Sequence, residues 1–422
     1  MGSNPARPAI DGIAALGGDM TVEERVHELA VRARAASAEL AKRTTAEKNA
    51  ALLKIADRLE ADKAAIMEAN ARDVANAESA GIGAAMVDRL TLTEARFKSM
   101  VDGVRYVVSL PDPVGEEIWS RTRPSGITIR KVRVPFGVVA VVFESRPNVF
   151  VDTAALCLKT GNAIILRGGK EALSSNGALA ASVSAALAEA GMGEAVQFVD
   201  FTDHAAVTEL VRAVGLVDIA IPRGGERLIR AMCEAALIPV LKHYKGVCHV
   251  YVDDSADLAM ALAILDNAKV QRPSACNAAE TLLVHERVAP LFLPMVRAWA
   301  KDKGVVLHEE GCDWGREFLA LEMNVGIVKD HREAIDHINR WGSHHSDCIV
   351  AGDGARAAEF LRDVDSATVY HNVSTRFTDG AEFGMGAEIG ISTDKLHARG
   401  PMGLEELTTY KYRVTGDGVV RA

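Results

Sequence analysis

The spacing of hydrophobic positions changes along the chain, and each spacing predicts a different kind of element. From residue 21 to about 77 apolar positions recur at helical intervals, and Leu52, Ile55 and Leu59 fall on one face. The same pattern predicts a helix over 93–108. The N-terminal quarter is therefore expected to be a group of amphipathic helices.

A segment with a period of two follows, "GITIRKVRVP" (126–135). Ile127, Ile129 and Lys131 fall on one face, and the opposite face alternates polar and apolar residues poorly. This pattern predicts a strand that lies outside the main core.

From residue 137 short apolar runs alternate with helical stretches. The first set of runs is "GVVAVVF", "AIILR", "VQFV", "VDIAI" and "VCHVYV", and a second set extends from "TLLV" to "ATVYHN". Runs of this kind are typical of strands buried on both faces of a parallel sheet, with helices covering each side. The pattern predicts two α/β domains that join near 268–276.

Composition and charge narrow the function classes. The chain has 422 residues, 49% of them hydrophobic, with a net charge of −9 and a pI of about 5.8. This balance argues against a general nucleic-acid binder. No run approaches the roughly 18 apolar residues of a membrane span, and the start of the chain has no signal-peptide pattern, so a cytoplasmic location is expected.

Six cysteines are spread through the chain without any C-x-x-C spacing, which indicates neither a disulfide framework nor a zinc-ligand cluster. Histidines include the pair in "SHHSD" (343–347), but H-E-x-x-H is absent, and no metal site is predicted.

One cysteine lies in a polar setting. Cys276, in "QRPSACNAAET" (271–281), stands between Ser274 and Asn277 where the two domains are expected to meet. A thiolate on a polar loop at a domain cleft is a candidate nucleophile. From composition alone a chance loop cysteine stays the alternative, and the other five cysteines are interpreted as packing or loop residues.

Two glycine-containing loops are candidate nucleotide sites. In "PRGGERL" (222–228), Gly224 and Gly225 follow a strand and open a helix, where backbone can approach a phosphate. In "ILRGGK", Arg167 ends a strand and Lys170 follows the glycines, which suits a nucleotide at that edge. An ordinary glycine-rich or solvated turn is the alternative for each.

Several longer stretches carry a family resemblance. They are "VPFGVVAVVFESRPNV" (134–149), "LKTGNAIILRGGKEA" (158–172), "IPRGG" (221–225), "QRPSACNAAETLLV" (271–284), "HINRWGSHHSDCIV" (337–350) and "STRFTDGAEFGMGAEIGISTDKLHARGPMGLEELTTYKY" (374–412). From about residue 21 to the C-terminus the chain resembles the γ-glutamyl phosphate reductases, a branch of the aldehyde dehydrogenase superfamily.

This resemblance implies an α/β aldehyde dehydrogenase-like fold with a Rossmann-like cofactor domain, an α/β catalytic domain and a small β flap for oligomers. The implied division is a disordered N-terminus (1–20), a cofactor domain (21–270, with 122–136 in the flap), a catalytic domain (271–395) and a C-terminal return with an oligomerisation strand (396–422).

The resemblance also implies a reaction, the NADPH-dependent reduction of L-glutamate 5-phosphate to the 5-semialdehyde plus phosphate, the second step of proline synthesis. Cys276 would form a thioester. Its own N–H and Asn148 would stabilise the oxyanion, with Arg146 as the next candidate and as a substrate-binding residue. Arg376 and Arg399 could bind the carboxylate or phosphate, and Asp379 or Glu382 the ammonium group.

By alignment with NAD-using relatives, Arg167 takes the position of a lysine and Lys170 that of a ribose-binding glutamate, which favours NADPH; a one-residue shift would put Glu171 there instead. Oxidising relatives also carry a catalytic glutamate in a segment that corresponds to 241–250, which here has no acid. We therefore expect a reductase that protects its thioester from water.

Three alternatives stay open at the level of sequence: a hydrolytic NAD-dependent aldehyde dehydrogenase, a thioester-forming acyltransferase and a non-catalytic partner protein. The resemblance implies a homo-oligomer, dimer or tetramer, and allows an association with glutamate 5-kinase. No nucleic-acid or membrane partner is expected.

Overall fold

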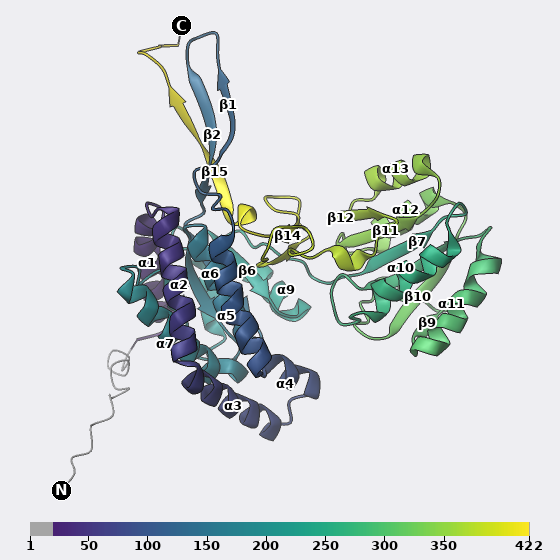
Figure 1. The fold of residues 1–422 in the computed structure, drawn as a ribbon, viewed down its shortest axis with the longest axis horizontal. Coiled ribbons are helices and arrows are strands. Elements are labelled where there is room, and N and C mark those ends of the chain that lie inside the picture. The colour runs from purple at the N-terminus through teal and green to yellow at the C-terminus, as the bar shows by residue number, and fades with distance from the viewer. Residues whose placement is uncertain (1–19, 422) are drawn as a thin grey trace.

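The computed structural model describes residues 20–421 as two α/β units joined by thin connections, with a narrow β arm that projects from the first unit (Figure 1). The expected disorder of residues 1–20 lies, except for Met20, outside the described residues. No helix in the described part of the chain is long and apolar enough to cross a membrane.

Helices open the first unit, and the continuous helical pattern of 21–77 forms three helices, the first two of which begin at side-chain caps. Thr21 and Thr44 each form a capping box, with Glu24 and Glu47 respectively, so a new helix begins after Thr44. The N-terminal helices are α1 (Val22–Leu40), α2 (Thr45–Ala61), α3 (Lys63–Ser79), α4 (Ala84–Leu90) and α5 (Glu94–Ser109).

A four-stranded parallel sheet forms the centre of the first unit, in the order β5-β4-β3-β6. Its strands are β3 (Val138–Phe143), β4 (Ala163–Arg167), β5 (Val196–Phe198) and β6 (Ile219–Arg223). Its helices are α6 (Pro147–Lys159), α7 (Leu173–Glu189), preceded by the 3-10 turn η1 (Lys170–Ala172), α8 (Ala205–Arg212) and α9 (Glu226–Ala235).

Helices cover both faces of this sheet, as the apolar runs predicted. Val139 and Val141 pack with α2, α5, α6 and α7 in one core, whereas Val138 and Ala140 pack with α1 and α8 in another. Alternate residues of one strand therefore belong to opposite cores, which is why the strand sequence is apolar throughout.

The second unit contains a six-stranded parallel sheet in the order β12-β11-β7-β8-β10-β9. Its strands are β7 (Cys248–Val252), β8 (Ala279–His285), β9 (Val306–His308), β10 (Glu322–Val328), β11 (Ser346–Val350) and β12 (Thr368–His371). Its helices are α10 (Leu258–Val270), α11 (Ala289–Lys303), α12 (His331–Trp341) and α13 (Gly354–Asp363). The short turn η2 (Thr375–Phe377) follows β12.

This sheet corrects the expected boundary at residue 271. β7 pairs with β8 and β11, and Val250 lies opposite Leu282 and Cys348. Because β7 is a central strand of the second sheet, it and α10 belong to the second unit, and the division falls between β6 and β7.

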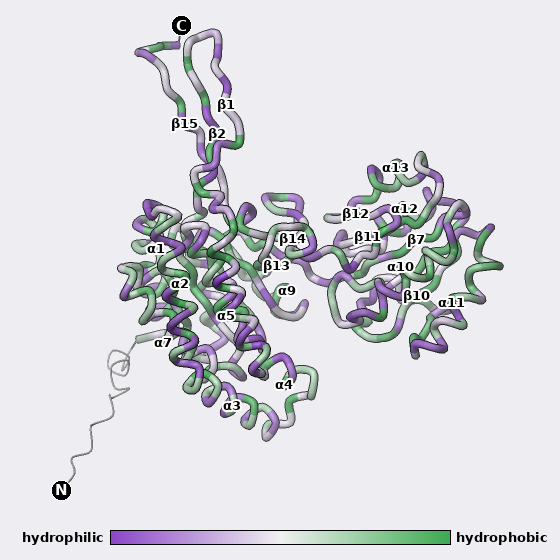
Figure 2. Tube along the Cα trace, in the orientation of Figure 1, coloured by the Kyte–Doolittle hydropathy of each residue, from purple (hydrophilic) through white to green (hydrophobic). Residues whose placement is uncertain are grey.

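The β arm is a three-stranded antiparallel sheet in the order β1-β2-β15, made of β1 (Glu117–Thr122), β2 (Thr128–Pro135) and β15 (Thr408–Thr415). The predicted strand and the C-terminal tail do pair, with Val132 opposite Lys411. Figure 2 shows mixed hydropathy along the arm, unlike the green strands inside the two units.

The segment between the second unit and β15 returns to the first unit. It contains β13 (Gly390–Ser392), β14 (Gly400–Met402) and the turn η3 (Glu405–Leu407), and Ile389, Met402 and Leu404 join the core of the first unit. The chain therefore crosses between the units twice, once before β7 and once before β13.

Candidate active site

Cys276 lies in the short loop between α10 and β8, at the amino edge of the six-stranded sheet, and its side chain is half-buried. Its carbonyl oxygen accepts a hydrogen bond from the buried Cys248 Sγ at 3.3 Å. A Cβ on Gly246 would overlap that same carbonyl. The backbone of Cys276 therefore packs directly on a glycine, and only glycine fits there.

A buried ion pair connects the two elements that flank this loop. Lys269, near the end of α10, donates from Nζ to Glu280 Oε2 on β8 at 2.8 Å, and both side chains are fully buried. Burial raises the pKa of Glu280 to about 7 and lowers that of Lys269, while each partner opposes the shift of the other. The pair fixes the spacing of the two ends of the loop.

Two histidines lie beside the thiol. One ring nitrogen of His243, one of His345 and Cys276 Sγ all lie within 4.8 Å of one another. The His243 Nδ1 atom is 2.9 Å from the carbonyl of Ile391, an acceptor only, so Nδ1 carries the proton and Nε2 is left as a base in the neutral ring.

His345 is fully buried, and burial lowers its pKa to about 4, so it is neutral near pH 7. Its Nδ1 is 2.9 Å from Ser346 Oγ, which in turn contacts the Thr378 hydroxyl at 2.5 Å. Its Nε2 has no hydrogen-bond partner among the described residues. The ring meets that of His243 edge to face, with 5.6 Å between ring centroids.

Arginines from both units surround Cys276. Arg146 follows β3, at the carboxyl edge of the first sheet, and Arg272 lies on the nucleophile loop. Desolvation and the positive charges of Arg223, Arg89 and Arg272 lower the pKa of Arg146, whereas Cys276 raises it. The carboxyl edge of one sheet thus faces the amino edge of the other across a strongly cationic site.

Arg376 is held against the nucleophile loop. Its Nε donates to Gln271 Oε1 at 2.8 Å, and its Nη1 bonds to Asn277 Oδ1. Desolvation and then Arg272 lower its pKa, while Cys276 raises it. Of the three arginines expected to bind substrate, Arg146 and Arg376 lie near Cys276.

Arg399 is engaged elsewhere. Its Nη1 donates to Asp365 Oδ1 at 2.9 Å and its Nη2 to the Asp365 carbonyl, and Lys395 pairs with the same carboxylate at 2.7 Å. These contacts connect the returning segment to the second unit, so the charge of Arg399 is used in a tie between the units.

The two acids expected to bind the ammonium group, Asp379 and Glu382, are exposed. Asp379 Oδ1 accepts from the backbone N–H groups of Ala381 and Glu382, which organises a turn. Asp379 is close enough to influence the pKa of Arg376, whereas no contact in the described structure draws Glu382 toward the thiol.

The position of Asn148 differs from the expected loop. It lies on the first turn of α6, because Pro147 starts that helix, and its Nδ2 donates to Asp152 Oδ2 at 2.8 Å. Desolvation raises the pKa of Asp152 to about 6, although Asn148 and Arg223 oppose the shift. Ser145, just before the turn, has a positive φ of 45°.

Sequence reasoning missed four residues of this site: His243, His345, Arg223 and Glu388. Desolvation raises the pKa of Glu388, while Arg223 and His345 lie close enough to influence it. The end of the strand "IAIPR" was a usable signal for Arg223. His345 comes near Cys276 through the strand order β11-β7-β8, and His243 and Glu388 lie on the segments that cross between the units, which local patterns do not reveal.

The predicted nucleotide edge has features that fit a dinucleotide. A Cβ on Gly168 would overlap Asn176 Nδ2, and both polar atoms of the buried Asn176 side chain lack partners in the described structure. Arg167 is buried at the end of β4 with its Nε unpartnered, and Lys170 is exposed. Orphaned donors beside a glycine turn at a strand end suit a bound nucleotide.

The alternative residue, Glu171, turns inward, and its Oε1 accepts from Ser145 N at 2.8 Å and from Ser145 Oγ at 2.6 Å. At the other loop, the Gly225 N–H at the start of α9 donates to Glu144 Oε2 at 2.9 Å. The backbone amide at which the sequence suggested a bound phosphate is therefore already hydrogen-bonded to a carboxylate of the chain itself.

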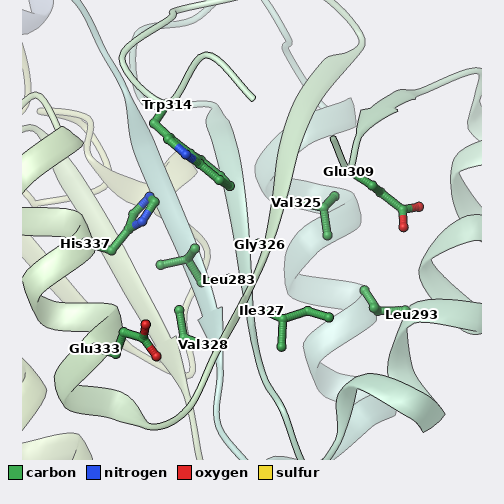
Figure 3. A pocket seen from close by; sticks show the side chains of 10 residues that line it. All are labelled: Leu283, Leu293, Glu309, Trp314, Val325, Gly326, Ile327, Val328, Glu333 and His337. Atoms are coloured by element: carbon green, nitrogen blue, oxygen red, sulfur yellow. The ribbon is translucent and has the colours of Figure 1, made fainter. Parts of the chain in front are cut away.

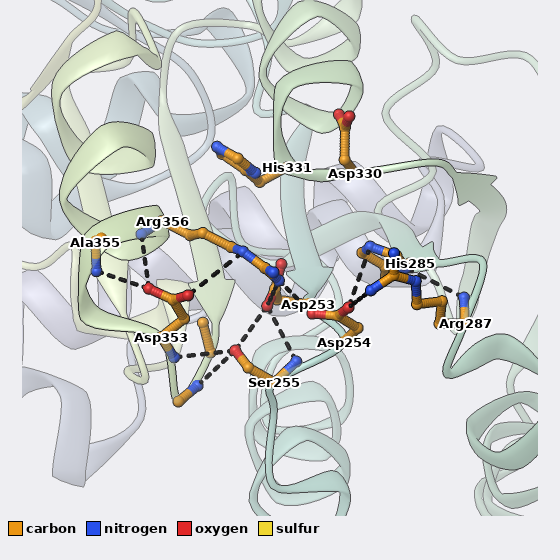
Figure 4. Close-up of polar contacts among 12 residues, drawn as sticks. Asp253, Asp254, Ser255, His285, Arg287, Asp330, His331, Asp353, Ala355 and Arg356 are labelled. Atoms are coloured by element: carbon orange, nitrogen blue, oxygen red, sulfur yellow. Dashed lines mark hydrogen bonds and ion pairs between the residues drawn. The ribbon is translucent and has the colours of Figure 1, made fainter.

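A cavity of about 380 Å³ lies away from Cys276 (Figure 3). It is lined by residues of β8, β10, α11 and α12 and by Trp314 in the segment between β9 and β10. At the carboxyl edge of the same sheet, Arg356 bonds to Asp253 and Asp254, Arg287 pairs with Asp254, and Ser255 caps Asp253 (Figure 4). The charged groups at that edge are therefore engaged with one another.

Comparison with known proteins shows the family to which the chain belongs. The sequence profile of the aldehyde dehydrogenase family matches residues 18–315. The chain belongs to the aldehyde dehydrogenase family. A γ-glutamyl phosphate reductase from Thermodesulfovibrio yellowstonii is 49% identical over 419 residues, 95% of this chain and 100% of the relative. One from Desulforamulus reducens is 51% identical over 94% of this chain and 99% of the relative. The family resemblance of the sequence motifs is confirmed.

Solved structures confirm the expected fold. The crystal structure of a γ-glutamyl phosphate reductase from Thermotoga maritima superposes with a TM-score of 0.92 at 44% identity, covering 94% of this chain and all of that one. An acetylating aldehyde dehydrogenase from Geobacillus thermoglucosidasius shares the fold at 17% identity with a TM-score of 0.68, covering 95% of this chain and 98% of that one.

Proposed function

We propose that this family member reduces L-glutamate 5-phosphate to L-glutamate 5-semialdehyde and phosphate with NADPH, the second step of proline synthesis from glutamate. The observation that carries the proposal is the position of the half-buried Cys276 thiol. It lies beside the imidazoles of His243 and His345 and near a group of arginines that come from both units. Relatives of about half identity over nearly the whole chain carry the name of this activity.

The first step uses residues of this chain alone. His243 Nε2, left unprotonated by the Nδ1 bond to Ile391, accepts the thiol proton of Cys276. The thiolate attacks the acyl carbon and the C–O bond to phosphate breaks, leaving a thioester on Cys276. His243 returns its proton to the departing phosphate, so the imidazole ends neutral.

The second step regenerates the thiol. When bound, the nicotinamide supplies the hydride that reduces the thioester carbon. The resulting thiohemiacetal oxyanion on Cys276 is stabilised by backbone N–H of that residue and by Asn148. Collapse releases the aldehyde and the thiolate, which takes up one proton from water through His243. The two steps together consume one proton for each molecule of acyl phosphate that is reduced.

The substrate is a polyanion, and the cationic groups fit it. Arg146 and Arg376 flank the thiol from opposite units and bind the phosphate and carboxylate in this proposal. Asp379 pairs with the ammonium group. Glu382 and Arg399 are less well supported, because Arg399 already binds Asp365.

For the cofactor, Arg167 and Lys170 hold the adenosine end, and Lys170 attracts the 2′-phosphate of NADPH. The orphaned Asn176 and Arg167 atoms at this edge support a nucleotide there. The bond between Glu144 and Gly225 weakens the case for Gly224 and Gly225 as phosphate ligands. The expected cytoplasmic location, the homo-oligomer and an association with glutamate 5-kinase stay predictions.

The reverse reaction tests this proposal. The segment 241–250 lies next to Cys276 and contains no acid to hydrolyse the thioester. Oxidation of glutamate 5-semialdehyde with NADP⁺ should therefore require phosphate or arsenate. Steady NADPH formation at a comparable rate in phosphate-free buffer would instead support a hydrolytic aldehyde dehydrogenase, in which His243 activates water.

A further inference from the structure

We propose that Cys276, His243 and His345 form a binding site for a soft divalent cation, Zn²⁺ in the first place, and that occupancy of this site reversibly blocks the nucleophile. The inference rests on the proposed function only for its consequence, the block; the cation site itself follows from the geometry of the three side chains.

The three donor atoms already lie within 4.8 Å of one another. With Zn–S of about 2.3 Å and Zn–N of about 2.0 Å, tetrahedral ligands stand roughly 3.3–3.8 Å apart, so about 1 Å of closure completes the site. Thiolate and imidazole are the ligand types that favour zinc over magnesium or calcium. Three protein ligands leave a fourth position for water or phosphate.

The second ring nitrogen of each histidine is already engaged. The N–H of His243 Nδ1 donates to the Ile391 carbonyl, and His345 Nδ1 pairs with Ser346 Oγ. Metal-binding histidines typically use their other nitrogen in this way, which sets the ring orientation. Both rings therefore have Nε2 available for a cation.

Burial supplies an independent observation. His345 is 0% exposed, and its Nε2 has no hydrogen-bond partner in the part of the chain that the structure describes. A buried polar atom without a partner is unfavourable, and a ligand that pairs with it relieves this. A ring nitrogen of His345 lies in the same cluster as the thiol.

Rigid elements carry the donors. His345 directly precedes β11, His243 lies on the crossing that leads into β7, and Cys276 lies on the loop that leads into β8. These three strands are neighbours in the order β11-β7-β8, so their amino ends present the donors side by side. Arg146, Arg272 and Arg376 nearby oppose a cation, while Glu317 and Glu388 near His345 and the thiolate itself offset them.

Binding would release the thiol proton to solvent and place the sulfur in a metal bond, so the thiolate could no longer attack an acyl carbon. The site is thus predicted to compete with substrate and to empty when a chelator is added. Activity should be highest in the presence of EDTA.

The test uses the reduced full-length protein and Co²⁺ as a spectroscopic probe, with Zn²⁺ as competitor. We expect one equivalent of Co²⁺ to give a near-ultraviolet thiolate-to-cobalt band with visible bands of a four-coordinate ion, displaced by Zn²⁺. Cys276→Ser should remove the thiolate band. His243→Ala and His345→Gln should each weaken affinity at least tenfold.

His344→Ala, next to the proposed ligand, and Cys233→Ser and Cys312→Ser, at the other two partly exposed thiols, are the matched controls and should bind as the parent does. If His345→Gln does not fold, His243→Ala, on a partly exposed side chain, still decides the question. Binding that survives the histidine variants unchanged, or no binding by the parent, overturns the site. A protein that shows the cobalt spectrum but has no reductase activity after EDTA has removed the metal refutes the proposed function instead.

Discussion

Cys276 differs from the buried cysteines in its neighbours, and this difference decides what each substitution should do. Burial alone raises the pKa of the Cys157 thiol, which is fully enclosed, so that group stays protonated. Cys276 is half-buried, and its neighbours are imidazole and guanidinium groups in place of core side chains.

Cys276→Ala should abolish turnover while the free energy of unfolding and NADPH binding stay nearly unchanged, because the side chain packs on a loop. Cys157→Ala should do the reverse and cost on the order of 1–3 kcal/mol, since it opens a cavity in the core of the first unit. Paired kinetic assays and urea denaturation of both variants check this. Substantial activity in purified Cys276→Ala would contradict the assignment of the nucleophile.

Lys170 should determine the choice of cofactor. A hydrogen bond from its ammonium group to the 2′-phosphate contributes about 1.5–3 kcal/mol, a preference of roughly 10- to 150-fold. Lys170→Glu should narrow or reverse the ratio of kcat/KM for NADPH over NADH, mainly through KM. Arg167→Ala should weaken both cofactors.

Glu171→Lys is the matched control. It tests whether residue 171, and not residue 170, makes the contact with the 2′-phosphate. In the structure the carboxylate of Glu171 is bound by Ser145, whereas Lys170 is exposed, which favours Lys170 as the contact. An unchanged cofactor ratio in Lys170→Glu would show that the register or the choice of NADPH is wrong.

At the scale of elements, the nucleophile loop depends on a glycine from the neighbouring crossing. A Cβ on Gly246 would overlap the Cys276 carbonyl, so Gly246→Ala must displace the loop. Because a shift of about 1 Å in an active site can cost on the order of 100-fold in rate, kcat should fall by that order.

Gly177 supplies the control for this substitution. It lies on α7 with open space where a Cβ would stand, so Gly177→Ala should keep full activity and add up to about 1 kcal/mol of helix stability. Equal kcat in the Gly246→Ala and parent enzymes would show that the loop position does not matter.

The buried ion pair between Lys269 and Glu280 should affect the free energy of unfolding differently when one partner or both partners are replaced. Removing one partner leaves an unpaired buried charge, so Lys269→Met or Glu280→Leu alone should cost about 3–5 kcal/mol, and the double variant should recover much of this. Denaturant titrations of the four proteins form the cycle. Additive single effects would mean that the pair is not coupled.

The sequence predicted the elements better than the site, and the reason is the range of the forces involved. Apolar runs such as "GVVAVVF" report burial directly, so the parallel strands were predictable one by one. The assignment of β7 to the second sheet was not, because strand order depends on pairing with β8 and β11 across long connections. His243 and His345 became site residues only through that order.

The expected loop position of Asn148 was wrong for a local reason, whereas its proposed role stays a prediction. The segment "ESRPN" has the polar composition of a loop, but Pro147 starts α6 and so places Asn148 on its first turn. By contrast, the polar neighbours of Cys276 conflicted with an ordinary packing role, and Arg376 stands in a motif of the family resemblance. The sequence therefore singled out two residues that the structure places close together.

At the scale of the whole molecule, the β arm is the least self-sufficient part of the chain. It projects away from both units, and β15 is an eight-residue edge strand whose last six residues are exposed (Figure 1). Tyr412 and Val414 on this strand are 54% and 56% exposed. A long exposed edge with large apolar side chains favours pairing with another chain.

We therefore predict that the arm holds a homo-oligomer together and that Val414→Asp dissociates it. Burying one large apolar side chain contributes about 1.5–3 kcal/mol, and a two-fold interface counts it twice, so the dissociation constant should rise by roughly 10²- to 10⁴-fold. Light scattering across a dilution series measures this. Leu396→Asp, the same change at an exposed leucine outside the arm, should leave the assembly intact. A parent protein that is monomeric at micromolar concentration, or a Val414→Asp variant that assembles as the parent does, would show that the arm serves another purpose.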